Sequence, residues 1–228
     1  MIDFKAKPFY LSDSKTAGGV HTDPEKAKEI VGCPEHKAYD REVADRSVTL
    51  VKNLENLIPI NPAEKKRVLL YTRIREEAYM TNDKGVGKMF VDALTRAGFE
   101  VTEYQPLENG MPDMAAFADR YDEVTNKYDL IIYMADLITD TNSNSVRMTW
   151  TPMMGADAPI YIPTVPTVFI SFANPYHLID VPRVRTFINA YKAKQSTIDA
   201  VVDKLVGKSE FKGISPVDPF CGRWDTRL

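Results

Sequence analysis

The residues best suited to chemistry in this sequence lie in the polar segment from Thr139 to Trp150. Short polar side chains come first, and the guanidinium of Arg147 and the indole of Trp150 follow them. The short polar side chains are Thr141, Asn142, Ser143 and Asn144. Amide and guanidinium groups hydrogen-bond hydroxyls, and an aromatic face packs against a sugar ring, so this set is typical of a carbohydrate contact. We predict that Asn142, Asn144, Arg147 and Trp150 bind substrate.

An ordinary surface turn accounts for the same segment equally well. Ser, Thr and Asn favour turns because their side chains bond the nearby backbone. Trp150, followed by Thr-Pro-Met-Met154, suits packing better than a binding platform. Arg147 can form a surface ion pair, for example with Asp140, worth at most about 1 kcal/mol. The sequence leaves both interpretations open.

A second candidate position follows the apolar run Val168–Phe172. This run is β-branched and aromatic, which is typical of a strand buried on both faces. Pro166 bounds it upstream, and Asn174-Pro175 ends it downstream because a proline cannot continue the ladder. Open α/β sheets bind ligands just past the carboxyl ends of their strands. We therefore expect His177 to be displayed there, and we predict that it binds substrate.

Motifs for metals, phosphates and nucleophilic serine are not met. The three histidines, His21, His36 and His177, are scattered and lack the spacing of a metal site. Lys84–Lys88 is short of a phosphate-binding loop, which needs an earlier glycine and a following Ser or Thr. Ile170–Asn174 does not match the GxSxG pattern of a nucleophile elbow. We therefore predict neither a metal nor a cofactor, and no catalytic residue.

The elements that position these residues alternate between strand and helix. The predicted strands are Val68–Thr72, Phe99–Tyr104, Asp129–Met134, Val168–Phe172 and Thr186–Tyr191, with a β-like stretch at Val48–Val51. The predicted helices are Glu35–Ser47, Val86–Ala97, Pro112–Asn126 and a last helix that begins near Ser196 and ends at Gly207. This alternation predicts the α/β class, with a parallel sheet covered on both sides.

Size and composition are those of an ordinary globular protein. The chain has 228 residues, 44% hydrophobic and 27% charged, and a net charge of -3, so nothing favours nucleic acid or an anionic membrane as partner. No apolar run is long enough to span a bilayer, and the first residues lack the apolar core of a signal peptide. Cys33 and Cys221 are far apart, which indicates free thiols in a reducing cytoplasm. We predict a connector arm over residues 1–32, a domain over 33–209 and a tail over 210–228.

Three passages resemble the second domain of glycoside hydrolase family 3. Glu42–Ile60 is similar to the helix, strand and "KN…N.LPL" passage that begins that domain, and Val168–Leu178 resembles its "SFANPYHL" strand. Gly213–Phe220 is similar to the tail of the two-domain bacterial members, many of which are β-N-acetylhexosaminidases. The resemblance implies a three-layer α/β/α sandwich with a mostly parallel sheet of five or six strands.

The same resemblance implies what this chain does not contain. Family members begin with a (β/α)8 barrel that holds the nucleophile, and such a barrel takes about 250 residues. The β-glucosidase branch takes its acid/base glutamate from the second domain, but no glutamate occurs here between Glu123 and Glu210. In the hexosaminidase branch the acid/base is a histidine on the barrel.

We therefore expect an isolated second domain of a β-N-acetylglucosaminidase-like enzyme. Alone it would be inactive, and its role would be to pack against the barrel and supply a loop to the rim of the sugar site. The alternative is a stand-alone module that binds a carbohydrate or another small ligand. A purely structural or dimerising domain is a third interpretation.

Overall fold

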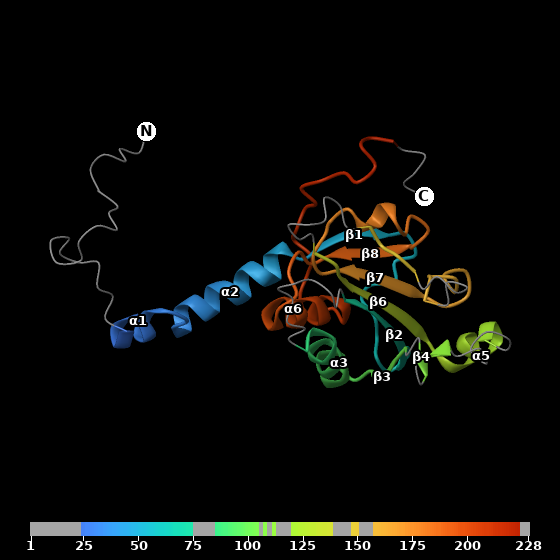
Figure 1. Ribbon diagram of the computed structural model, residues 1–228, viewed down its shortest axis with the longest axis horizontal. Helices are drawn as coiled ribbons and strands as arrows, with labels where there is room; N and C mark the ends of the chain where they lie inside the picture. Colours follow the sequence, from blue (N-terminus) through green and yellow to red (C-terminus); the bar gives the residue numbers. More distant parts are fainter. Residues whose placement is uncertain are drawn as a thin grey trace. The chain divides into compact units, whose positions relative to one another are not determined.

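The computed structural model describes residues 24–74, 85–104, 107–108, 111–112, 120–138, 147–150 and 157–223. The chain divides into two units, Met1–Asp40 and Arg41–Leu228. The first unit contributes α1 (Pro24–Ile30) and the beginning of α2 (Pro34–Ser47). The second unit holds the sheet, its covering helices and the C-terminal tail (Figure 1).

The second unit is built on a six-stranded sheet in the order β1-β8-β7-β6-β2-β3 (Figure 1). Its strands are β1 (Thr49–Asn53), β2 (Arg67–Ile74), β3 (Glu100–Glu103), β6 (Leu130–Asp136), β7 (Thr167–Ser171) and β8 (Thr186–Asn189). All neighbouring pairs are parallel except β1 and β8, which run antiparallel. The predicted α/β class and the mostly parallel sheet are confirmed.

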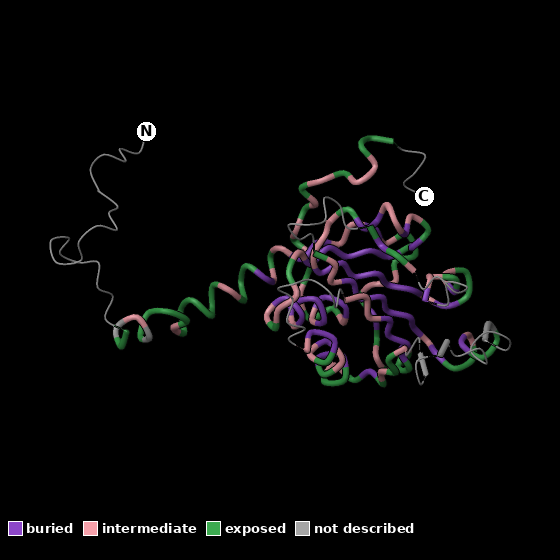
Figure 2. Tube along the Cα trace, viewed as in Figure 1, coloured by how far each residue is buried: buried purple, intermediate pink, exposed green. Residues whose placement is uncertain are grey.

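Helices cover both faces of this sheet. The even-numbered side chains of β2, β6, β7 and β8 pack against α3 (Val86–Arg96) and α6 (Gln195–Leu205). The odd-numbered side chains of the same strands pack with α5 (Arg120–Lys127) and with the loops around Tyr161 and Val181. Because successive strand residues point to opposite faces, both sets are buried, as the purple strands in Figure 2 show.

Five aromatic rings form a row across the odd-numbered face. They are Tyr104, just after β3, then Tyr71, Tyr133, Phe169 and Phe187, one on each successive strand. Consecutive ring centroids are 4.5, 4.5, 5.8 and 5.3 Å apart, and the last three pairs are nearly parallel. We call this set the aromatic row. Since a shift by one residue would turn these rings to the other face, the row fixes the strand register.

The structure describes only part of one predicted helix. The sequence indicated a helix over Pro112–Asn126; residues 120–126 are helical, in α5, and residues 113–119 lie outside the described residues. Pro112 belongs instead to β5 (Met111–Pro112), which pairs with β4 (Leu107–Glu108), so the predicted first residue of the helix is wrong. The two residues between these short strands are Asn-Gly, the commonest signal for a tight hairpin.

The apolar side chains of α2 are mostly exposed. Ala44 is buried, but Tyr39 and Val43 are 56% and 62% exposed. The helix therefore offers two large apolar side chains, one turn apart, that the described residues of this chain do not cover.

A buried lysine connects α2, α6 and the C-terminal tail. Lys204 Nζ donates to Asp45 Oδ1 at 2.9 Å, to Ser209 Oγ at 3.3 Å and to the Glu210 carbonyl oxygen at 2.6 Å. The Lys204 side chain is 1% exposed and packs over the Phe211 ring. The hydrogen bond from Lys204 is the main cause that lowers the pKa of Asp45. We call these residues the Lys204 cluster.

The tail beyond this cluster lies close against the start of β1. A Cβ added to Gly213 would lie only 2.7 Å and 2.9 Å from the carbonyl oxygens of Ser47 and Val48. A side chain at that position would displace the tail, so glycine is required there. This gives a physical reason for the glycine that opens the passage Gly213–Phe220.

Candidate binding site at the carboxyl edge of the sheet

Two ion-pair clusters lie where β2, β6 and β7 end. In a parallel sheet the carboxyl ends of neighbouring strands meet at one edge, and open α/β sheets bind their ligands there. Arg73 is the second-to-last residue of β2, and Arg147 belongs to the chain that follows β6. His177 lies in the short helix η1 (His177–Ile179) after β7. The predicted site residues that the structure describes are therefore at the expected edge.

Asp180 is the centre of the first cluster. It accepts hydrogen bonds from Arg147 Nε at 2.5 Å and from the Met148 backbone N–H at 3.2 Å. His177 Nδ1 lies 3.4 Å from the same carboxylate. The Asp180 side chain is 7% exposed, whereas that of Arg147 is 62% exposed. Asp180 thus holds Arg147 by its Nε, while most of the Arg147 side chain stays exposed. We call this set the Asp180 cluster.

His177 is buried and not displayed as we expected. Its side chain is completely inaccessible, because η1 turns the ring inward while Tyr176 takes the exposed position. Burial lowers the pKa of His177, and it outweighs the opposing effects of Asp180 and the Leu137 backbone. Arg147 lowers this pKa further. The neutral ring therefore contacts Asp180 and no solvent, and its predicted contact with substrate stays a prediction.

This buried histidine predicts that stability falls in mild acid. Because the pKa of His177 is lowered on folding, the unfolded chain takes up the proton first when the pH drops below 6.5. The free energy of unfolding then decreases as the pH falls from 6.5 toward the pKa of His177 in the folded chain, by up to about 1.4 kcal/mol per pH unit. Urea unfolding between pH 7.5 and 5.5 measures this slope. We expect His177→Gln to flatten it and His36→Gln, at an exposed position of α2, to leave it unchanged. An unchanged slope in His177→Gln would contradict the assignment.

The second cluster forms around Arg73. Its two Nη groups donate to the Asp157 carboxylate and to the Thr149 carbonyl oxygen. Its guanidinium carbon lies 5.6 Å from the centroid of the Trp150 ring. Asp157 is 2% exposed, so this ion pair is removed from water on its acidic side. Arg73 therefore connects the segment 147–150 with the chain that resumes at residue 157. We call this set the Arg73 cluster.

Trp150 packs against the aromatic row. Its ring meets that of Tyr133 edge to face, with centroids 6.3 Å apart and an interplanar angle of 86°. Burial raises the pKa of Tyr133, and the protonated hydroxyl donates to the Ala158 carbonyl oxygen at 3.1 Å. Trp150 is half-buried, with Arg73 over its ring. Its contacts combine packing with a remaining exposed edge.

The two clusters show what sequence reasoning found and what it missed. Asn142 and Asn144 lie outside the described residues, as does the proposed partner Asp140. The described partner of Arg147 is Asp180. Arg73 and Asp180 were not predicted. Arg73 ends a strand at the ligand-binding edge, and Asp180 follows His177 by one helical turn, so both had a usable signal.

The carboxylates of both clusters are paired with arginines. Asp157 and Asp180 are both buried and each holds an arginine, so neither carboxylate faces an open substrate position.

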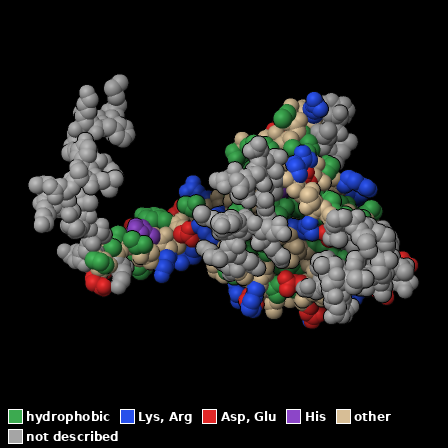
Figure 3. All heavy atoms as spheres, viewed as in Figure 1, with side chains coloured by type: hydrophobic (Ala, Val, Ile, Leu, Met, Phe, Trp, Pro, Cys, Tyr) green, Lys and Arg blue, Asp and Glu red, His purple; other side chains and the backbone are tan. Residues whose placement is uncertain are grey.

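Among the described residues, no group of three or more His, Cys, Asp and Glu side chains is placed to hold a metal ion. No helix in the described part of the chain is long and apolar enough to cross a membrane. Basic and acidic side chains are interspersed on the face drawn in Figure 3.

Comparison with known proteins identifies the class: the chain is a C-terminal α/β/α sandwich domain of glycoside hydrolase family 3. A Cellulomonas fimi protein named β-N-acetylglucosaminidase/β-glucosidase is 42% identical over 212 residues, which is 92% of this chain and 37% of that protein. No family model matches the chain. The resemblance of the chain to this domain is thus confirmed.

Solved structures agree with this assignment. The β-glucoside phosphorylase BglX superposes with a TM-score of 0.76 at 35% identity, over 90% of this chain and 35% of its own. A family 3 β-N-acetylglucosaminidase from Paenibacillus sp. FPU-7 gives a TM-score of 0.52 at 16% identity, which shows the shared fold alone. The chain spans little more than a third of the length of these relatives, and they contain substantial further chain.

Proposed function

We propose that this domain completes the sugar site of a β-N-acetylglucosaminidase-like enzyme whose (β/α)8 barrel supplies the catalytic groups. The support is the 42% identity over nearly the whole chain to a relative that is about two and a half times as long. In this proposal the segment 147–150 lies at the rim of the sugar site, and Arg147 contacts the substrate. Asp180 and Arg73 hold that segment in place.

Cys33 and Cys221 are free thiols, which supports a reducing, cytoplasmic setting.

A second candidate reaction is favoured by one observation. The TM-score to the phosphorylase BglX is 0.76, against 0.52 for the Paenibacillus glucosaminidase. Hydrolysis and phosphorolysis break the same glycosidic bond and differ only in the acceptor, which is water in one case and phosphate in the other. The complete enzyme would then release a sugar phosphate. Assays with and without phosphate separate the two reactions.

The test joins this domain to a barrel. The matched region of the Cellulomonas fimi relative is exchanged for this chain, and cleavage of aryl N-acetylglucosaminides and aryl glucosides is measured. We expect the exchanged enzyme to be active and the chain alone to show no turnover. Turnover by the chain alone that a point mutation within it abolishes would overturn the proposal.

In the exchanged enzyme, Arg147→Ala is expected to lower kcat/KM about tenfold, which is about 1.4 kcal/mol of transition-state binding. The reason is that the mutation removes guanidinium donors that Asp180 holds toward the ligand. The melting temperature should fall as well, because Asp180 is 7% exposed and keeps only the Met148 N–H and His177 as described partners, so kcat/KM is measured well below the melting temperature of the variant. Arg183→Ala, at another exposed arginine before β8, is the matched control. Full kcat/KM in Arg147→Ala would reduce the segment to a surface loop.

A further inference from the structure

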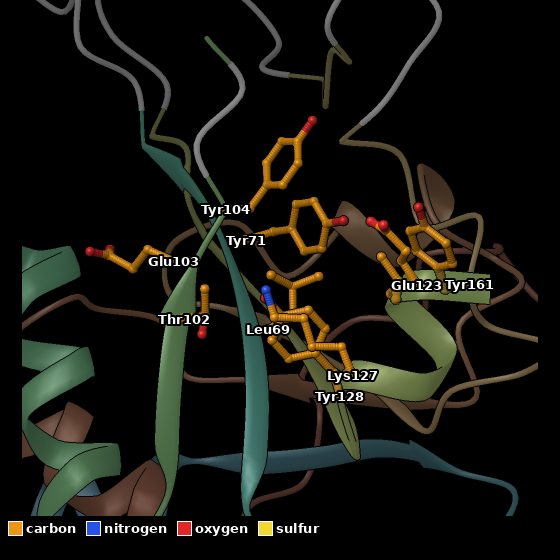
Figure 4. A pocket seen from close by; sticks show the side chains of 10 residues that line it. Leu69, Tyr71, Thr102, Glu103, Tyr104, Glu123, Lys127, Tyr128 and Tyr161 are labelled. Carbon is orange, nitrogen blue, oxygen red and sulfur yellow. The ribbon is translucent and has the colours of Figure 1, made fainter. Parts of the chain in front are cut away.

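A pocket of 210 Å³ lies on the odd-numbered face of the sheet, at the Tyr104 end of the aromatic row (Figure 4). Its walls come from β2, the end of β3, α5 and Tyr161. None of its lining residues belongs to the Asp180 cluster or the Arg73 cluster. The proposed function gives this pocket no role.

The floor of the pocket is apolar and its upper wall is polar. Leu69, Val124 and Tyr128 are each less than a tenth exposed and form the apolar part. Figure 4 shows the Tyr71 hydroxyl and the Glu123 carboxylate pointing toward one another across the opening, with the Tyr161 hydroxyl beside Glu123. Phenol hydroxyls both donate and accept hydrogen bonds, and a carboxylate accepts them.

The pocket opens to solvent, and its polar wall distinguishes it from an empty apolar cavity. A cavity that stays empty in a protein is lined by apolar groups alone, whereas polar walls hold water. The volume is several times the roughly 30 Å³ that one water molecule occupies in the liquid. A ligand that supplies hydroxyl groups can replace such waters and keep their hydrogen bonds.

The charges around the pocket disfavour an ionic ligand. Glu123 and Lys127 are one helical turn apart on α5, so one negative and one positive group line the same wall. Glu103 points away from the opening in Figure 4, and its Oε1 lies 3.8 Å from the Cβ position of Gly87 on α3. Its charge is therefore directed to the other face of the sheet. The pocket is close to neutral.

The orientation of the rings disfavours a flat aromatic ligand. Tyr71 lies between Tyr133, on which it is stacked, and Tyr104, whose ring is tilted by 31° at a centroid distance of 4.5 Å, so both of its faces are covered. The ammonium of Lys127 lies 5.4 Å from the centroid of the Tyr128 ring. The pocket thus presents ring edges and hydroxyls. What fits is a compact, uncharged ring with several hydroxyl groups.

We propose that this pocket binds a single uncharged sugar ring, as a second carbohydrate site of the domain. The inference goes beyond the proposed function, because it needs neither Arg147 nor a barrel. Glucose and N-acetylglucosamine are the probes. Each is titrated into the 228-residue chain while amide resonances are followed by NMR.

We expect saturable shifts at Leu69, Val124 and Tyr128, with a Kd on the order of millimolar, as is usual for so small a ligand. Val124→Phe fills the pocket and should abolish the shifts. Glu123→Gln keeps the shape, removes the charged acceptor and should weaken binding about tenfold. Asp122→Asn, the exposed neighbour on α5 that does not line the pocket, should bind as the parent chain does.

Three results would overturn the inference. The first is the absence of saturable shifts with either sugar at about a hundredfold excess over a millimolar Kd. The second is a set of shifts confined to Arg147, Met148 and His177, because it would place the sugar at the candidate site. The third is saturation of the same amides by tetramethylammonium or phosphate at lower concentration than by sugar. Failure of the domain exchange would leave these outcomes unaffected, so the two proposals fail separately.

Discussion

Replacing Lys204 with alanine is expected to remove about 2–5 kcal/mol of unfolding free energy, because a fully buried long side chain and the three hydrogen bonds of its ammonium are lost. The ammonium is fully buried and bonds Asp45, Ser209 and the Glu210 carbonyl. Its loss leaves the Glu210 carbonyl without its donor and the Asp45 carboxylate without its counterion. Domains of this size have about 5–15 kcal/mol in total, so the variant will be close to unfolding at body temperature.

Urea unfolding measures this change, and hydrogen exchange locates it. The matched control is Lys208→Ala, whose side chain is 64% exposed and lies 3.6 Å from Asp203. We expect that control to change stability by less than about 0.5 kcal/mol. In Lys204→Ala the amides of residues 209–211 should exchange faster before the sheet does. A loss below about 1 kcal/mol would mean that water replaces the ammonium easily, and the cluster would then be only a surface contact.

Phe169→Ala is expected to cost a similar 3–5 kcal/mol, the usual range for a buried phenylalanine. Phe169 is fully buried at the centre of the sheet, between the rings of Tyr133 and Phe187. Its removal interrupts the aromatic row and opens a cavity that the stiff central strands cannot close. Tyr133 would lose a neighbour on one side, and the environment of Trp150 would change with it.

Denaturant unfolding and tryptophan fluorescence test this prediction together. Phe169→Leu retains most of the volume and should cost about 1–2 kcal/mol, which separates the loss of ring stacking from the cavity. Tyr176→Ala removes an aromatic ring that is 48% exposed and should change stability little. If Phe169→Ala and Tyr176→Ala destabilise the unit equally, the aromatic row has no special part in its stability.

Much of the fold could be predicted because local patterns agreed with burial. Val68–Thr72 and Val168–Phe172 are continuous apolar runs, and the structure buries both faces of the corresponding strands β2 and β7. The last predicted helix matches α6, and Gly207 follows it with φ of 77°. Pro112, predicted as the first residue of a helix, lies in β5 instead, and the preceding Asn109-Gly110 is the hairpin signal that indicates this.

The candidate site was harder to predict because its partners are distant in sequence. Arg147 and Asp180 are 33 residues apart, and Arg73 and Asp157 are 84 residues apart. Neither pairing follows from periodicity, since both depend on the placement of β2, β6 and β7 side by side. His177 was expected at the surface because it follows a strand, but the direction of the turn after Asn174 decides which side chain points inward.

The first and last strands of the sheet are neighbours, and this determines how the unit can be linked to other chain. β1 pairs with β8, Asp45 meets Lys204, and Gly213 lies against Ser47 and Val48. The polypeptide therefore enters and leaves the unit at one edge of the sheet. Because its two ends lie close together, such a domain can be inserted between two neighbouring positions of a host protein without moving those positions apart. A tension applied to its two ends would be borne by the β1–β8 ladder and the Lys204 cluster, while β2, β6 and β7 would be spared.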